Sequence, residues 1–167
     1  MTDLIIREVT VSDSDELLTL RGLIDRETDF MLREADELPG REKHHEWILG
    51  VVANPTQAVF VAELGGKLVG YSMCFGGGLQ RLSKTGTIVI GILKEHHRKG
   101  MGKELFEQII SWAQKQGFHR LELEVDTGNT PAIQLYEKMG FEIEGVRKDA
   151  VCIRDEYKDL YMMAKIL

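Results

Sequence analysis

The chain of 167 residues contains only two cysteines, Cys74 and Cys152. They lie far apart in apolar segments and lack a CxxC spacing, which favours two buried free thiols in a reducing cytoplasm over a disulfide. No uninterrupted apolar stretch is long enough to cross a bilayer. The first residues, MTDLIIREVT, lack a basic stretch followed by an apolar one, so a signal peptide is not expected. These absences predict a cytoplasmic protein that does not associate with membranes.

The sequence also has no excess of basic residues. Its formal net charge is -6 at pH 7, which argues against nucleic-acid binding because such domains carry a positive surface. The acidic excess would suit a cationic substrate. With 43% hydrophobic and 29% charged residues, the composition is that of a soluble globular protein. The length predicts one domain spanning residues 1–167.

Hydrophobic periodicity indicates a mixed α/β protein. Strands are expected over residues 4–9, 58–64, 67–75, 85–93, 120–126, 141–153 and 157–166. Helices are expected after a Ser12 cap, over residues 41–52, after Gly102, and over residues 130–139. Gly65 and Gly66 predict a tight hairpin, and Gly140 is expected to end the last helix. The order is one strand, two helices, three strands, then helix, strand, helix and two strands.

A glycine pair in the segment HHRKGMGKELFEQ stands between a predicted strand and a predicted helix. Free N–H groups at a helix start bind anions, and Gly100 and Gly102 carry no side chain that blocks close approach. Arg98 and Lys99 add positive charge. The segment matches neither a Walker loop nor a full dinucleotide loop, because position 105 is leucine. From the spacing alone, a phosphate site and a simple tight turn both remain open.

A second motif, DTGNTPAIQLYEKMGF, begins at Asp126. Together with the glycine segment it resembles the GCN5-related N-acetyltransferase (GNAT) superfamily. The first motif of that family, Q/R-x-x-G-x-G/A, is filled by residues 97–102, and the later one is matched by Asn129, Ala132, Leu135, Tyr136, Gly140 and Phe141. The C-terminal part is similar to the ribosomal-protein alanine and small-amine acetyltransferases. The resemblance implies a mostly antiparallel twisted sheet flanked by helices, with the strands at 85–93 and 120–126 splayed apart.

The resemblance implies acetyl-CoA as a co-substrate. Its pyrophosphate would lie on the backbone amides from Arg98 to Lys103, and its pantetheine arm beside residues 90–93. The implied cofactor-binding residues are Ile90, Gly91, Ile92, Leu93, His97, Arg98, Lys99, Gly100, Met101, Gly102, Lys103, Asn129, Ala132 and Tyr136. The sequence departs from the family pattern at His97, where Gln or Arg is usual, and at Arg98, where Gly is frequent.

Two catalytic residues are implied for direct attack by an amine. Tyr136 matches the family tyrosine that protonates the departing thiolate, with core packing as its alternative role. Glu124, in the segment LEV, matches the glutamate that deprotonates the amine in ribosomal-protein alanine acetyltransferases. Its alternatives are a solvated strand face, a partner for a neighbouring arginine, or replacement by a water chain.

The acceptor is left open by the sequence. We expect a primary amine on a small molecule or a protein N-terminus, and a possible homodimer. The adjacent histidines at 44–45 and 96–97 point apart, so no metal site is expected. Tyr71 borders the acceptor side but is interpreted as structural, and the acidic stretch from Asp25 to Glu37 as a solvated face. Alternatives to acetyl transfer are a non-catalytic acyl-CoA-binding module and an enzyme that uses another acyl-CoA donor.

Overall fold

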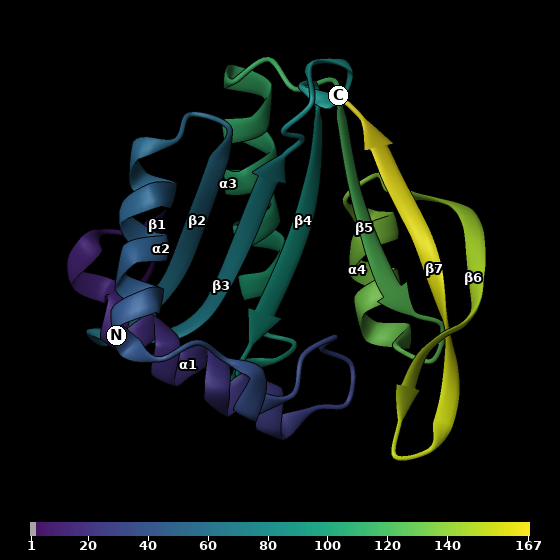
Figure 1. Cartoon of the computed structure of the whole chain (residues 1–167), viewed down its shortest axis with the longest axis horizontal. Helices are drawn as coiled ribbons and strands as arrows, with labels where there is room; N and C mark the ends of the chain where they lie inside the picture. Colours follow the sequence, from purple (N-terminus) through teal and green to yellow (C-terminus); the bar gives the residue numbers. More distant parts are fainter. Residues whose placement is uncertain (1–2) are drawn as a thin grey trace.

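The computed structural model describes residues 3–167, and its strands form one open sheet with the order β1-β2-β3-β4-β5-β7-β6 (Figure 1). The strands are β1 (Leu4–Glu8), β2 (Gln57–Leu64), β3 (Lys67–Gly76), β4 (Thr85–Ile92), β5 (Arg120–Asp126), β6 (Glu142–Ile153) and β7 (Glu156–Ile166). The α-helices are α1 (Ser14–Glu27), α2 (Arg41–Ala53), α3 (Met101–Lys115) and α4 (Thr130–Lys138). This is the mixed α/β architecture and the element order that the sequence predicts.

The sheet is antiparallel except where β4 meets β5. These two strands are parallel and pair only from Thr85–Thr87 to Arg120–Glu122. Beyond Thr87 they separate toward their carboxyl ends, as Figure 1 shows. The predicted splay is therefore confirmed, and it leaves one edge of β4 without a strand partner over most of its length.

Helices cover both faces of the sheet and divide the core in two. Helices α3 and α4 lie behind the sheet in Figure 1, over a core that includes Phe106, Tyr136 and Phe141. Helices α1 and α2 lie in front, over a core that includes Leu17, Ile48 and Tyr71. The two cores give the β4–β5 edge two chemically different sides.

The predicted hairpin is present in the structure, whereas the predicted cap of the first helix is not. Gly65 and Gly66 have φ values of 61° and 77°, as the predicted hairpin requires. The Ser12 cap is wrong. A short 3₁₀ turn precedes α1, and Asp13 rather than Ser12 receives the backbone N–H of Thr10, at 2.7 Å. Arg7 reaches the same carboxylate at 2.7 Å, so a long-range ion pair fixes this turn.

The two cysteines differ in exposure. Cys74 is buried in the core beneath α3, as predicted, whereas Cys152 on β6 is exposed, so its predicted burial is wrong. Strand β6 is half-buried or exposed throughout because it lies at the edge of the sheet, outside both cores. None of the helices formed by residues 3–167 has the length and apolar character needed to span a membrane.

Candidate active site

The unpaired edge of β4 presents the backbone groups of only two of the four strand residues implied in cofactor binding. Leu93 donates its N–H to the Val69 carbonyl of β3 at 3.0 Å. Because antiparallel pairing alternates along a strand, Gly91 also faces β3, and Ile90 and Ile92 face the β5 side. The backbone groups of Ile90 and Ile92 are therefore the ones that an extended ligand could pair with at this edge.

His97 interacts directly with this edge. Its Nε2 lies 2.8 Å from the carbonyl oxygen of Ile92, so a tautomer that is protonated at Nε2 donates to that oxygen. The His97 side chain thus links the start of the glycine segment to the end of β4. His97, which departs from the family pattern, therefore lies beside the splayed edge.

The connection into α3 has the backbone expected of an anion site. Arg98 and Gly100 both have positive φ, 61° and 83°, and Gly100 is the N-cap of α3. A Cβ built at Gly100 would meet nothing within 4 Å, so the space in front of this turn is open. The exposed side chains of Arg98, Lys99 and Lys103 add positive charge to the free N–H groups of the helix start.

Gly102 serves a different purpose from Gly100. A Cβ at Gly102 would lie 2.8 Å from Leu135 Cδ2 and 3.5 Å from Ile92 Cδ1. The predicted open approach therefore holds at Gly100 and not at Gly102, where the glycine lets α3 pack closely on α4 and β4. Met101 beside it is buried in the core.

Asn129 of the second motif immediately precedes helix α4. Its side-chain oxygen accepts the N–H of Ala132 at 3.4 Å, which makes Asn129 the N-cap. The oxygen is therefore used by the helix, while the amide nitrogen can still donate to a ligand. Ala132 is half-buried against the core. Both residues lie on the α3–α4 face of the sheet.

Tyr136 is 8% exposed and packs between two aromatic rings. Its ring centroid lies 5.3 Å from that of Phe106 and 6.4 Å from that of Phe141. Burial raises the pKa of its phenol above the ordinary value, so the phenol keeps its proton at neutral pH. Cys74, in the same core, has its thiol pKa raised to about 12 by burial alone. Burial would raise the pKa of a thiol that leaves in this environment, as it raises that of the phenol.

Glu124 lies on the opposite face of β5 from Tyr136. The β5 residues Leu121, Leu123 and Val125 are buried toward α3 and α4, so Glu124 points toward the side of α1 and α2. Its Oε1 accepts from Arg147 Nη1 at 2.6 Å. One predicted alternative, a partner for a neighbouring arginine, is therefore present. The pair is partly exposed to solvent.

A buried polar cluster on the α1–α2 side was missed by sequence reasoning. Arg21 and Asp25 of α1 are each 6% exposed, and His44 of α2 is fully buried. Tyr71 of β3 lies beneath them and is 2% exposed. The interpretation of residues 25–37 as a solvated face is therefore wrong for Asp25. The available signal was spacing: Arg21 falls one turn after Leu17, inside the apolar stripe of α1.

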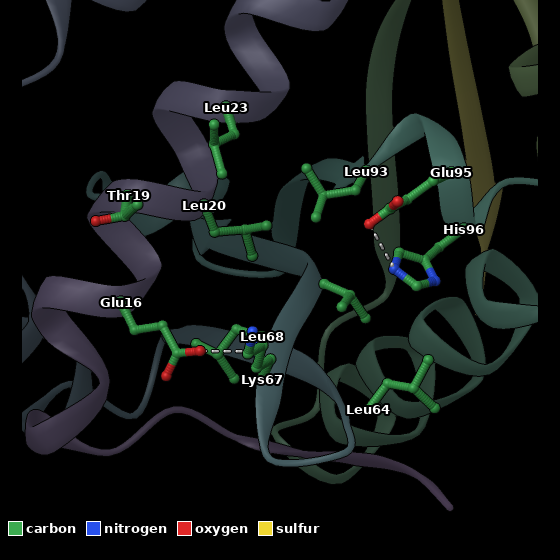
Figure 2. Close-up of a pocket in the computed structure, with 11 residues that line it drawn as sticks. Glu16, Thr19, Leu20, Leu23, Leu64, Lys67, Leu68, Leu93, Glu95 and His96 are labelled. Atoms are coloured by element: carbon green, nitrogen blue, oxygen red, sulfur yellow. Dashed lines mark hydrogen bonds and ion pairs between the residues drawn. The ribbon is translucent and has the colours of Figure 1, made fainter. Parts of the chain in front are cut away.

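A shallow groove of about 380 Å³ lies between α1, the start of β3 and the turn that follows β4 (Figure 2). Leu20, Leu23 and Leu68 form much of its wall, and Glu16 accepts the N–H of Leu68 at 2.8 Å. Of the residues implied in cofactor binding, only Leu93 lines it. The groove is thus separate from the glycine turn. The described residues hold no cluster of metal-binding side chains.

Comparison with known proteins agrees with this geometry. The family model described as acetyltransferase (GNAT) family matches residues 20–141. The L-amino acid N-acetyltransferase of Escherichia coli K12 is 31% identical over 128 residues, which are 73% of this chain and 76% of that protein. The ribosomal protein bS18-alanine N-acetyltransferase of the same organism is 35% identical over 75 residues, 45% of this chain and 51% of that protein.

Solved structures give the same answer at the level of the fold. An acetyltransferase of the GNAT family from Streptococcus pneumoniae has a TM-score of 0.95 and 32% identity, and the match covers 99% of this chain and all of that one. A phosphinothricin acetyltransferase from Sinorhizobium meliloti, solved with acetyl-CoA, has a TM-score of 0.88 at 18% identity, over 100% of this chain and 89% of that one. The chain belongs to the GNAT acetyltransferase family, and its relatives are N-acetyltransferases.

Proposed function

We propose that this protein transfers an acetyl group from acetyl-CoA to a primary amine by direct attack. The observation that carries the proposal is the combination of an unpaired β4 edge with an open, positively charged turn at Gly100. The edge offers backbone groups to the amides of the pantetheine arm, and the turn offers N–H groups to the pyrophosphate. Acetyl-CoA, when bound, supplies an activated thioester.

The two faces of the sheet divide the reaction between donor and acceptor. Residues implied in donor binding lie at the start of α3 and on α4, with Tyr136, behind the sheet. Glu124 faces the opposite side, together with α1 and α2. The donor would therefore lie on one side of the splayed edge and the amine would approach from the other. Because β4 and β5 are separated there, no strand stands between them.

Tyr136 is proposed as the general acid. Its buried phenol is protonated at neutral pH and can give that proton to the departing thiolate. The Ile92 N–H, which faces the unpaired edge, is proposed to polarise the thioester carbonyl. Glu124 is proposed to accept the proton of the incoming amine, directly or through water. No protein nucleophile is required, and buried Cys74 with its raised thiol pKa is unsuited to that role.

The test combines a binding measurement with turnover. Calorimetry measures acetyl-CoA binding, and thiol release is then followed across a panel of small amines and N-terminal peptides for the wild type and Tyr136→Phe. We expect donor binding in both proteins and a kcat at least about tenfold lower in the variant. A variant with unchanged kcat would remove Tyr136 as the acid. Failure of the wild type to bind acetyl-CoA would overturn the assignment of the glycine turn.

Two alternatives keep the same fold. A non-catalytic acyl-CoA-binding module would bind the donor and leave every amine unmodified. An enzyme for another acyl donor would prefer succinyl- or propionyl-CoA in the same assay. The retained Tyr136 favours catalysis over the binding module, because a binding module has no use for a proton donor; the choice between acyl donors is left to the assay.

A further inference from the structure

Two buried and oppositely charged side chains on α1 each have one enclosed polar atom without a hydrogen-bond partner among the described residues. Arg21 and Asp25 are four residues apart, so they lie on the same face of the helix in neighbouring turns. Arg21 Nε and Asp25 Oδ2 are both enclosed, and neither has a hydrogen-bond partner among residues 3–167. Within that range the two side chains also form no ion pair with each other. Buried charges are normally paired, so this arrangement requires an explanation.

The two side chains lie on the acceptor side of the splayed edge. The end of α1 is fixed to the end of β4, because Glu27 accepts the N–H of Lys94 at 2.8 Å. Tyr71 lies beneath the pair, and its ring contacts Gly91 of β4. Helix α1 therefore runs past the carboxyl end of β4, on the side facing away from α3 and α4 (Figure 1). This is the side from which the proposed function brings the amine.

The electrostatics of the cluster favour an anion. Arg33, an exposed residue between α1 and α2, adds its positive charge to the surroundings of Arg21, Asp25 and Tyr71. Burial lowers the pKa of Arg21 and raises that of Asp25, because the attraction between the two groups offsets only part of their desolvation. Arg26 and Glu34 also act on Asp25, so three guanidinium groups near two carboxylates leave a net positive charge. Arg33 is exposed, and Arg21 and Asp25 each keep 6% of their surface exposed.

The Arg21 guanidinium is already held in a fixed orientation. Its Cζ lies over the ring of Trp47, 5.0 Å from the ring centroid, and its Nε has no hydrogen-bond partner among residues 3–167. A planar guanidinium that is held by stacking is well suited to a bidentate pair with a carboxylate. The neighbouring Asp25 carboxylate can accept hydrogen bonds from an ammonium group.

We propose that Arg21 and Asp25 form an acceptor subsite for an α-amino acid, with Arg21 binding the carboxylate and Asp25 the amino group. This inference rests on the proposed acetyl transfer and names the substrate class for that site. An α-amino acid carries an ammonium group and a carboxylate on the same carbon atom. It can therefore bridge two side chains that form no ion pair with each other. A simple amine would leave Arg21 buried and unpaired, so the subsite selects for the carboxylate.

The test compares amino acids with their decarboxylated counterparts. L-leucine and L-phenylalanine are assayed beside 3-methylbutylamine and 2-phenylethylamine, with kcat/KM as the readout. The variants are Arg21→Met, which removes the charge and keeps most of the side-chain volume, and Arg21→Lys, which keeps the charge. Arg41→Met is the matched control, because Arg41 is an exposed guanidinium on α2 that pairs only with Asp15. Calorimetry measures binding of the same amino acids without acetyl-CoA, and thermal melting checks that each variant is folded.

We expect the wild type to favour each amino acid over its amine by about 10- to 100-fold, the range for a charged hydrogen-bond pair. Arg21→Met should remove most of this preference, with the rate for the amine changing less than about threefold, and Arg41→Met should keep the preference. Arg21→Lys should retain part of it, because a lysine keeps the charge but not the bidentate geometry.

Three results would overturn the subsite. The first is equal turnover of amino acids and amines by the wild type. The second is an equal loss for both classes in Arg21→Met, which would mean that Arg21 only packs on Trp47. The third is amino-acid binding that is undetectable in the wild type. Each leaves the proposed function standing if acetyl-CoA still binds and another amine is acetylated, so the two failures are distinguishable.

Discussion

The ring of Tyr71 lies directly against the backbone of Gly91 on the neighbouring strand. A Cβ at Gly91 would come within 2.9 Å of Tyr71 Cε1 and Cζ, closer than carbon atoms can approach. The two residues are directly opposite in the β3–β4 ladder. Tyr71 therefore crosses over β4 toward the splayed edge, and only glycine at position 91 allows this. The contact links the acceptor-side cluster to the strand implied in donor binding.

Gly91→Ala should destabilise the protein by about 1–3 kcal/mol, because the added methyl group forces the buried ring to move. Urea denaturation measures the loss. In a Tyr71→Leu background the same substitution should cost less, since the ring is absent. Gly50→Ala is the control: this helical glycine has nothing within 4 Å of its added Cβ, so alanine should be neutral or stabilising. An equal cost of Gly91→Ala in both backgrounds would contradict the contact.

The two glycines of the α3 turn should respond differently to alanine. Gly100 has positive φ and open space, so Gly100→Ala should cost about 1 kcal/mol of stability and also raise the KM for acetyl-CoA. Gly102→Ala should mainly destabilise the protein, and Leu135→Ala should relieve part of that cost by removing the side chain that it meets. Melting temperatures and initial rates at varied acetyl-CoA give both quantities. A Gly100→Ala enzyme with normal KM would argue against donor binding at this turn.

Because Glu124 pairs with Arg147, substitutions at the two positions can distinguish a catalytic base from a residue that only forms an ion pair. If Glu124 accepts the proton of the amine, Glu124→Gln should lower kcat by about tenfold or more, whereas Arg147→Met should change it less than about threefold. The pair is partly exposed, so neither substitution should change stability by more than about 1 kcal/mol. Equal losses of kcat in the two variants would assign the pair a structural role, and unchanged kcat in both would favour a water chain.

His44 should make stability depend on pH between 7 and 5. Burial lowers its pKa from 6.5 to about 4, so the folded protein holds the neutral ring while the unfolded chain binds a proton. Stability is therefore fully present above pH 6.5 and is lost as the pH falls from 6.5 toward 4. The expected loss is about 2 kcal/mol between pH 7 and 5, by urea denaturation. Asp25, whose pKa is raised above 3.8 by burial, acts in the opposite direction as the pH falls.

His44→Gln removes the titrating ring and should flatten this dependence. His45→Gln is the matched control, because His45 is the exposed neighbour on the same helix. Its pH dependence should equal that of the wild type. The assignment would not survive if His44→Gln lost as much stability as the wild type between pH 7 and 5.

Much of the fold and part of the site could be predicted because they depend on local chemistry. The hairpin at Gly65–Gly66 needs two residues that accept positive φ, and the strand and helix periods can be read from neighbouring residues. The capping turn before α1 could not be assigned in this way. Asp13 is chosen there by Arg7 of β1, and that ion pair forms only after the strand and the turn are brought together.

The sequence by itself determined the family, the element order and the positions of the glycine turn and Tyr136, because these lie in motifs of fixed spacing. Tertiary structure alone decided which groups of those motifs face a ligand. It directed the backbone groups of Ile90 and Ile92 toward an unpaired edge, and used Gly102 for helix packing. It also buried Arg21 and Asp25 beside Tyr71. The physical reason is that the burial of a side chain and the absence of a strand partner depend on elements distant in sequence, so no local pattern predicts them.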